Sequence, residues 1–328
     1  MYRTTISIFC SHIVMALCLT LSGCSEREFD WVSNSPLSVY AKNHNENSEW
    51  PSSSDSLKIL AIGNSFTDNS MDLLPQLLKA HELNHITLGK IGYGGATLQN
   101  HEQFFRKASP VYLFQVKPSQ EYEWKTLSSH ATIEEAIQHA DWDIIVLQQA
   151  SALSGLYNHY QPYLNRFIEH LLSSATNPDV VFAWHMTWPY STLCQTKAFA
   201  PYNYNPAMMY ESICQTTGTA LEETGIKYVI PSGTVIHELR NSLINKDSSD
   251  FTNDGIHINH PIGQYALACT WFQSIFHPIY SQRMDSIPHS TKHIVTPLDM
   301  KELQLLHDIV RNSVNKPLFD KNNKEQSN

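Results

Sequence analysis

The sequence predicts an α/β fold, a three-layer sandwich in which helices cover both faces of a central, mainly parallel five-stranded sheet. Two observations predict this fold. Short and nearly continuous apolar runs recur along the chain, as is typical of strands that are buried on both faces. Stretches with helical spacing separate these runs, as right-handed crossovers between parallel strands require. The 328 residues, 42% of them hydrophobic, are ample for one large core.

The order of the elements follows from the same patterns. We expect strands at residues 57–62, 85–91, 143–147, 180–183 and 227–230. Helices are expected near residues 71–83, 132–140, 162–174, 206–224, 235–241, 262–275 and 303–314. Thr132 and Glu135 form a capping-box pattern at the start of the second of these helices.

The first 24 residues resemble the signal peptide of a bacterial lipoprotein. Arg3 precedes a mostly apolar stretch at residues 6–21, which is shorter than the roughly 20 apolar residues of a membrane span. Leu21-Ser22-Gly23-Cys24 is similar to a lipobox, whose cysteine is lipidated after cleavage just before it. The resemblance implies a lipid-anchored protein outside the bacterial cytoplasm, either periplasmic or at the cell surface. An uncleaved anchor and an ordinary secretory signal are the alternatives.

Composition separates a polar linker from a folded domain. Residues 25–56 are rich in serine and asparagine and lack an apolar period, so we expect a disordered polar tether there and one folded domain at 57–328. The formal net charge is −9 and no basic block stands out, which disfavours nucleic-acid binding. Beyond the lipobox, the remaining cysteines allow at most one disulfide and leave open whether any two pair: Cys194, Cys214 and Cys269.

A serine lies where the first predicted strand ends. The strand stops at Gly63-Asn64-Ser65, just ahead of the first predicted helix. In open α/β sheets the carboxyl ends of the strands form the ligand-binding edge. Ser65 is therefore predicted to be accessible to a substrate, although a serine in such a turn also serves commonly as a cap or turn residue. We interpret the aromatic-rich stretch 99–130 as an insertion beside this site.

An aspartate and a histidine, three residues apart, precede the helix expected at 262–275. In a turning loop the Asp254 carboxylate can accept the Nδ1 proton of His257, which leaves Nε2 to face a hydroxyl. This pair predicts a general base, His257, that Asp254 orients. A zinc site at His257 and His260 is the competing interpretation, but neither a third ligand nor HExxH spacing accompanies these histidines.

The serine and the Asp-x-x-His pair together resemble the SGNH, or GDSL-like, hydrolase superfamily. The segment 63–67 resembles the block that carries the nucleophile, here Ser65, although Asn64 stands where aspartate is common. Asp254 and His257 match the final block of that superfamily. The resemblance implies a flavodoxin-like three-layer fold and a catalytic triad of these three residues.

The resemblance extends over residues 57–276 and has one departure. The segment 92–97 resembles the block whose glycine, here Gly95, gives a backbone N–H to the oxyanion hole. The third block usually contains Gly-x-Asn-Asp, whose asparagine donates a side-chain N–H to the oxyanion, but this chain has Gln148 and Gln149 there. A glutamine amide offers the same donors on a longer stem, so Gln149 or Gln148 is a candidate for that role.

The resemblance implies a serine esterase that needs no metal and no other cofactor. O-acetyl or other short acyl groups on carbohydrate are the leading substrates, and the membrane is the second partner, through the lipid anchor. The alternative is a catalytically inactive, glycan-binding lipoprotein that retained the fold, which the departure in the third block keeps open. Four side chains after the fourth strand suggest the lining of a sugar-binding or acyl-binding cleft: Trp184, His185, Trp188 and Tyr190.

Overall fold

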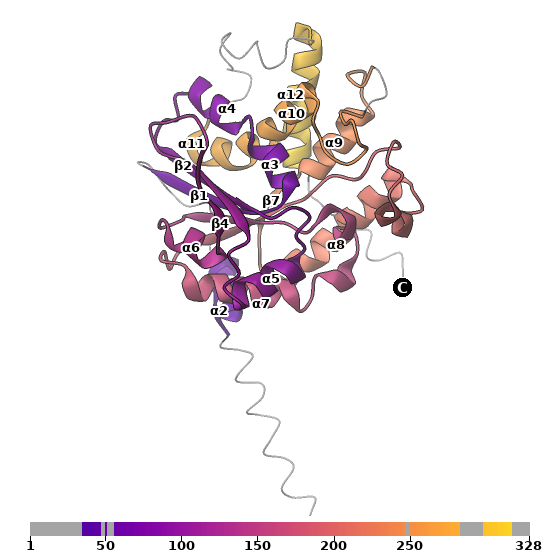
Figure 1. Cartoon of the computed structure of the whole chain (residues 1–328). Helices are drawn as coiled ribbons and strands as arrows, with labels where there is room; N and C mark the ends of the chain where they lie inside the picture. Colours follow the sequence, from indigo (N-terminus) through magenta and orange to yellow (C-terminus); the bar gives the residue numbers. More distant parts are fainter. Residues whose placement is uncertain (1–34, 47–49, 51–55, 247–249, 283–297, 317–328) are drawn as a thin grey trace, which may run out of the picture.

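A twisted sheet forms the centre of the molecule (Figure 1). The structure, a computed structural model, describes residues 35–46, 50, 56–246, 250–282 and 298–316. Within this part of the chain the sheet has seven strands in the order β4-β3-β2-β1-β5-β6-β7. The strands are β1 (Leu57–Gly63), β2 (Ile86–Gly92), β3 (Tyr112–Lys117), β4 (Lys125–Ala131), β5 (Ile144–Leu147), β6 (Val181–His185) and β7 (Tyr228–Ile230).

The predicted fold class is confirmed, but the predicted number of strands is wrong. The five predicted strands form the parallel part of the sheet, in the order β2-β1-β5-β6-β7. Two further strands pair antiparallel, β3 with β2 and β4 with β3, and apart from Ala131 they lie in the stretch interpreted as an insertion. Most residues of β4 are exposed, so the sequence of that strand carries no apolar pattern.

Helices cover both faces of the sheet (Figure 1). One layer contains α3 (Ser65–Met71), α4 (Leu74–Ala80), α9 (Ser232–Arg240), α10 (Pro261–Trp271), the π-helix η4 (Phe272–Phe276), α11 (His277–Tyr280) and α12 (Met300–Asn315). The other contains α2 (Pro36–Glu46), α5 (Leu98–Arg106), α6 (Ile133–Gln138), α7 (Tyr163–Ser174) and α8 (Pro206–Thr224). Short 3₁₀ turns η1 (Ser151–Leu153), η2 (Tyr157–His159) and η3 (Lys197–Tyr202) complete the connections.

Helix α2 corrects the prediction that residues 25–56 are a disordered tether. Leu37 and Tyr40 of this helix are buried, and the Tyr40 hydroxyl accepts a hydrogen bond from the backbone N–H of Phe182 in β6 (2.9 Å). Two buried side chains make too short an apolar stripe to produce a period that the sequence reveals. Residues 1–24, with the predicted lipobox and Cys24, lie outside the described residues.

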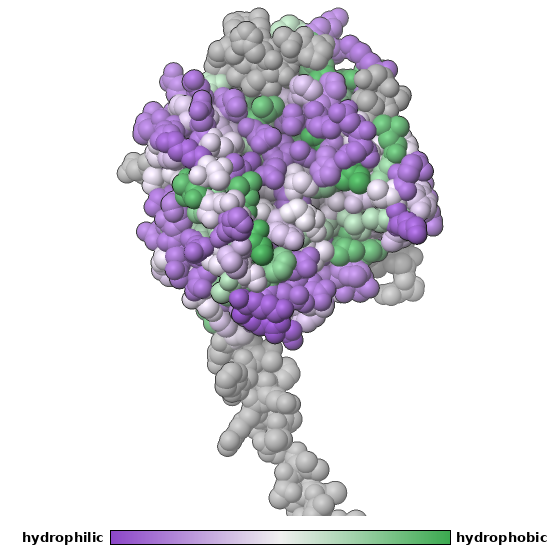
Figure 2. All heavy atoms as spheres, in the orientation of Figure 1, coloured by the Kyte–Doolittle hydropathy of each residue, from purple (hydrophilic) through white to green (hydrophobic). Residues whose placement is uncertain are grey.

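The visible surface is mostly polar, and the described cysteines are not paired in disulfides. Polar side chains cover most of the face in Figure 2, and apolar side chains gather there in small separate groups. Cys194, Cys214 and Cys269 are free thiols. Within the described residues, no helix has both the length and the apolar character to cross a membrane.

Candidate active site

Ser65 is the first residue of α3 and follows directly from the carboxyl end of β1. The helix begins earlier than predicted because Asn64 caps it: its Oδ1 accepts the N–H of Phe66 (3.0 Å). Gly63 is needed for close packing, since a Cβ at this position would lie 2.2 Å from Oγ1 of Thr67. The tight strand-to-helix turn therefore fixes the serine at the carboxyl end of the central strand β1.

The structure brings the three predicted triad residues together. Ser65 Oγ lies 2.9 Å from His257 Nε2, although 192 residues separate them in the sequence. His257 Nδ1 lies 2.6 Å from Asp254 Oδ2. Hydroxyl, imidazole and carboxylate thus form one continuous hydrogen-bonded chain, the geometry of a serine nucleophile with its base and the group that orients the base.

The carboxylate of Asp254 is held as an acceptor. Its Oδ1 accepts the backbone N–H groups of Ile256 and His257 (2.8 Å each) and the hydroxyl of Thr252 (3.0 Å). Partial burial raises the pKa of Asp254, but the hydrogen bonds from His257 and these other donors outweigh burial and hold the pKa well below its ordinary value. An ionised Asp254 makes His257 Nδ1 the donor and leaves Nε2 to accept the Ser65 proton.

The loop that carries the histidine is shaped by close packing. Gly255 has a φ of +79°, and a Cβ there would lie 2.4 Å from the backbone nitrogen of Cys194, so only glycine fits. Trp188 anchors the same loop, because its Nε1 donates to the carbonyl oxygen of Ile256 (2.8 Å). Its ring also stacks on Phe66, with centroids 4.2 Å apart. Trp188 therefore joins the histidine loop to the helix that begins at the serine.

The predicted oxyanion glycine lies in a turn that is fixed to the serine turn. Asn64 Nδ2 donates to the carbonyl oxygen of Ala96 (3.1 Å), beside Gly95. Gly95 has a φ of +70°, and a Cβ there would meet no atom within 4 Å. Among the described residues, neither the Ser65 N–H nor the Gly95 N–H donates to another group. Both remain available to bind an oxyanion, and the role of Gly95 stays a prediction.

Gln148 hydrogen-bonds to two residues of the turn that carries Ser65. Its side chain is buried, Nε2 donates to Asn64 Oδ1 (2.8 Å), and Oε1 accepts the Thr67 hydroxyl (2.6 Å). These contacts favour a structural role for Gln148. Its role in the oxyanion hole stays a prediction, which requires the amide to offer its second hydrogen.

Gln149 holds the end of the glycine turn (residues 92–97) by a hydrogen bond in the same way. Its Oε1 accepts the N–H of Leu98, at the start of α5, and the N–H of Ala150 (3.0 and 2.9 Å). Its Nε2 donates to the carbonyl oxygen of His159 (3.0 Å). The side chain is buried, so Gln149 also has structural contacts, and its oxyanion role likewise stays a prediction.

A buried histidine, His185, contacts Gln148 and so extends the hydrogen-bond network behind the serine turn. Asn64 Oδ1 accepts a backbone N–H, which identifies the facing atom of Gln148 as nitrogen and the atom facing His185 as oxygen. His185 Nδ1, 3.1 Å from that oxygen, therefore carries the proton, and Nε2 accepts from the Ser232 hydroxyl (3.0 Å). Burial lowers the pKa of His185 to about 3. The imidazole is neutral in the folded protein at ordinary pH.

Because His185 stays neutral in the folded protein, we expect the free energy of unfolding to fall as the pH is lowered. Between pH 6.5 and about 3 the unfolded chain protonates this imidazole and the folded protein does not. The free energy of unfolding therefore falls by about 2 kcal/mol per such histidine from pH 7 to pH 5. We expect the His185→Gln variant to lose about 2 kcal/mol less than the unchanged protein over this interval in urea unfolding. Equal losses would contradict the prediction.

Two further interpretations of the sequence do not match the structure. Trp184, Trp188 and Tyr190 are buried, as is His185, so they support the fold and do not line a cleft. The side chain of His260 accepts the N–H of Ile262 as the cap of α10. The described residues contain no group of three or more potential metal ligands.

Three supporting residues were not predicted: Asn64 as a link between turns, Thr252 on the aspartate, and Trp188 behind the histidine loop. Thr252 had a local signal, because a threonine two residues before an aspartate commonly forms such a turn. The contacts of Asn64 and Trp188 depend on residues far away in the sequence. Nothing local in the sequence reveals them.

Comparisons with known proteins identify a family. The profile named Domain of unknown function (DUF4886) matches residues 58–289. The crystal structure of a DUF4886 family protein from Bacteroides uniformis is similar, with 30% identity and a TM-score of 0.72 over 83% of this chain and 99% of that chain. No curated protein matches the sequence.

Two other solved structures are more distant. A proposed SGNH hydrolase from Slackia heliotrinireducens is 19% identical, with a TM-score of 0.45 over 67% of this chain and 98% of that chain. An acetylxylan esterase from Geobacillus stearothermophilus is 12% identical, with a TM-score of 0.45 over 70% and 100%. Likenesses at this level identify no activity. Since the family profile matches well over half of its residues, this chain belongs to the DUF4886 family.

Proposed function

We propose that this protein is a serine esterase of the SGNH type. The observation that carries the proposal is the continuous chain from Ser65 Oγ through His257 to Asp254, with distances of 2.9 and 2.6 Å. The N–H groups of Ser65 and Gly95, which have no acceptor in the part of the chain that the structure describes, lie in turns that Asn64 joins. A helix cap or a structural histidine needs no such arrangement.

The chemistry follows from these contacts. Ser65 Oγ attacks the carbonyl carbon of the ester while His257 Nε2 takes its proton, and Asp254 stabilises the resulting imidazolium. The tetrahedral oxyanion binds the N–H groups of Ser65 and Gly95. His257 then protonates the departing alcohol oxygen, which leaves an acyl group on Ser65. A water molecule, deprotonated by His257, releases the acid.

The proposed substrate is an acylated carbohydrate, with O-acetyl as the leading group. The resemblance to the SGNH superfamily and the predicted export of the chain support this choice. The triad is partly open to solvent, since the side chains of His257 and Asp254 are 36% and 48% exposed. Ser65 is half-buried beside them, so a substrate can approach the triad from solvent.

Turnover and covalent labelling test the activity. Purified residues 25–328 are expected to hydrolyse p-nitrophenyl acetate and to react with a fluorophosphonate at one position. Peptide mass spectrometry should find the label on Ser65, and Ser65→Ala should lose both reactions. Acetate release from a panel of acetylated oligosaccharides then defines the substrate. Glycan binding without turnover and without labelling would instead support an inactive binding protein.

We also propose that Cys24 carries a lipid anchor that holds the protein outside the cytoplasm. The lipobox-like sequence before the cysteine supports this proposal. In a bacterial host, the unchanged protein should partition into the detergent phase of a membrane extract and Cys24→Ser should not. The same partitioning for both proteins would favour an uncleaved anchor.

A further inference from the structure

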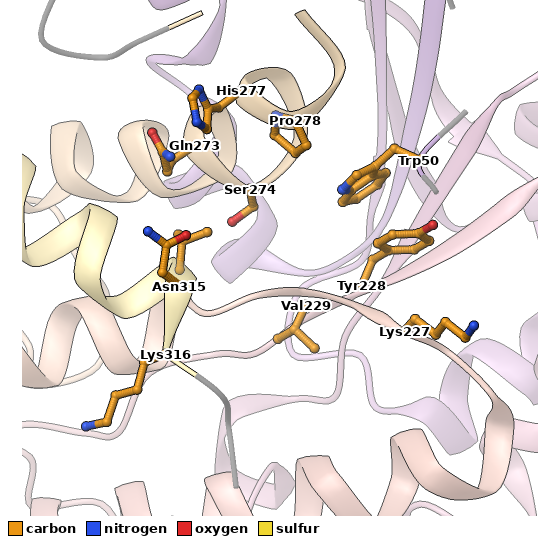
Figure 3. Close-up of a pocket in the computed structure, with 11 residues that line it drawn as sticks. Trp50, Lys227, Tyr228, Val229, Gln273, Ser274, His277, Pro278, Asn315 and Lys316 are labelled. Atoms are coloured by element: carbon orange, nitrogen blue, oxygen red, sulfur yellow. The ribbon is translucent and has the colours of Figure 1, made fainter. Parts of the chain in front are cut away.

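A cavity lies at the free edge of the sheet, beside β7. It has a volume of about 400 Å³ and is bounded by β7, by η4 and α11, and by the end of α12 (Figure 3). It lies beyond the carboxyl end of α10, whereas the catalytic histidine precedes the start of that helix. The rise of a helix from Pro261 to Gln273 separates the two places by about 18 Å. The cavity is therefore distinct from the candidate active site.

One wall of the cavity is aromatic. Trp50 stacks on Tyr228 of β7, with ring centroids 4.0 Å apart and an interplanar angle of 29°. Figure 3 shows these rings together on one side of the cavity, with Pro278 beside Trp50. Flat aromatic surfaces in a concave site bind ligands that present apolar C–H faces. A pyranose ring is such a ligand, because its axial C–H groups form a face and its hydroxyls lie around the edge.

The facing wall is polar, and the sequence explains its shape. Pro278 has no N–H for the carbonyl oxygen of Ser274 and its ring crowds that oxygen, so the helix widens into the π-turn η4 just before it. Gln273 and Ser274 lie in this turn, and both line the cavity. Asn315 brings a second carboxamide from α12. Single π-turns inside α-helices occur frequently at functional sites.

The hydroxyl of Ser274 is the second observation that points to a ligand. This residue is only 5% exposed, and its Oγ has no hydrogen-bond partner among the described residues. In Figure 3 the hydroxyl points toward the side where Asn315 lies. A buried hydroxyl without a partner is unusual in a folded protein and needs an explanation. A ligand hydroxyl between Ser274 and Asn315 supplies one.

The charges around the cavity favour a neutral ligand. No carboxylate from the described residues lines the cavity. Lys227 and Lys316 lie at its rim, and Figure 3 shows their ammonium groups directed away from its centre. The other polar lining groups are two amides, a hydroxyl and the imidazole of His277, whose Nδ1 donates to the carbonyl oxygen of Gln282 (2.7 Å). Aromatic and aliphatic side chains make up the rest of the lining. We propose that this cavity binds a neutral saccharide unit, at a site separate from the serine.

Calorimetry with defined sugars tests the proposal on a protein without turnover. Xylohexaose, cellohexaose and mannohexaose are titrated into the Ser65→Ala variant, and at least one is expected to bind in the millimolar range or tighter. Adding Trp50→Ala should weaken that binding about tenfold or more. Trp124→Ala, which removes another partly buried tryptophan at the opposite edge of the sheet, is the matched control and should bind as before.

Further variants keep the test decisive. If Trp50→Ala does not fold, Gln273→Ala replaces it, since this change removes one amide from the polar wall. Failure of all three sugars to bind, or equal losses in the Trp50 and Trp124 variants, would overturn the proposal. Hydrolysis of p-nitrophenyl acetate should be unchanged by Trp50→Ala in a protein with Ser65. Loss of the esterase activity alone would affect the proposed function and leave the binding site standing.

Discussion

The substitution Asp254→Asn is expected to lower kcat for ester hydrolysis by about 10⁴-fold, the scale that loss of the correct histidine tautomer produces in triads of this kind. Asparagine Oδ1 can still accept the N–H groups of Ile256 and His257, as Asp254 Oδ1 does now. Its NH₂ group then occupies the place of Oδ2 and faces His257 Nδ1. Two donors cannot face each other, so the imidazole proton moves to Nε2.

The displaced proton explains the size of the effect. A protonated Nε2 donates to Ser65 Oγ and cannot take its proton, so the nucleophile is no longer activated. The measurement is kcat for p-nitrophenyl acetate together with the melting temperature. Asp308→Asn on α12 is the matched control, because Asp308 pairs with Arg311 away from the site and should leave kcat unchanged. A loss in Asp254→Asn of less than about tenfold would show that the triad does not operate.

The fold was predictable where burial leaves a pattern in the sequence. The strand at 57–62 is buried along most of its length and therefore forms an apolar run in the sequence, as do β5 and β6. Strand β4 and helix α2 were not predicted, because each is stabilised by partners elsewhere in the chain. β4 pairs with β3 through its backbone, and the side chains of α2 that are described as buried are those of Leu37 and Tyr40.

The candidate site was predictable in its reacting groups and less so in its support. Ser65, Asp254 and His257 follow from their places relative to a strand end and a helix start. The contacts of Gln148 and Gln149 do not, because an amide can donate or accept and its orientation depends on remote partners. In the structure each glutamine ties the third block to another turn, Gln148 to the serine turn and Gln149 to the glycine turn.

The substitution Asn64→Asp is expected to lower kcat strongly. Aspartate is nevertheless common at this position in the SGNH superfamily. The buried Nδ2 donates to the carbonyl oxygen of Ala96 (3.1 Å). An ionised aspartate would place an oxygen against that carbonyl oxygen, so the glycine turn moves away from Ser65. Misplacing one oxyanion donor costs about 10²–10³ in kcat.

The pH dependence distinguishes this mechanism from simple loss of contacts. A protonated carboxyl at position 64 can still donate to Ala96, so burial raises the pKa of this carboxyl in the folded variant. The folded variant then holds a proton that the unfolded chain releases, and the free energy of unfolding falls as the pH rises from 5 to 8. Asn64→Ala, the control, removes the same contacts without a titrating group, so its deficit relative to the unchanged protein should not vary with pH. Urea unfolding and kcat at several pH values measure both variants. Parallel deficits across this range would mean that the hydrogen bond to Ala96 does not position the turn, and that the oxyanion donors near Ser65 are held by other contacts.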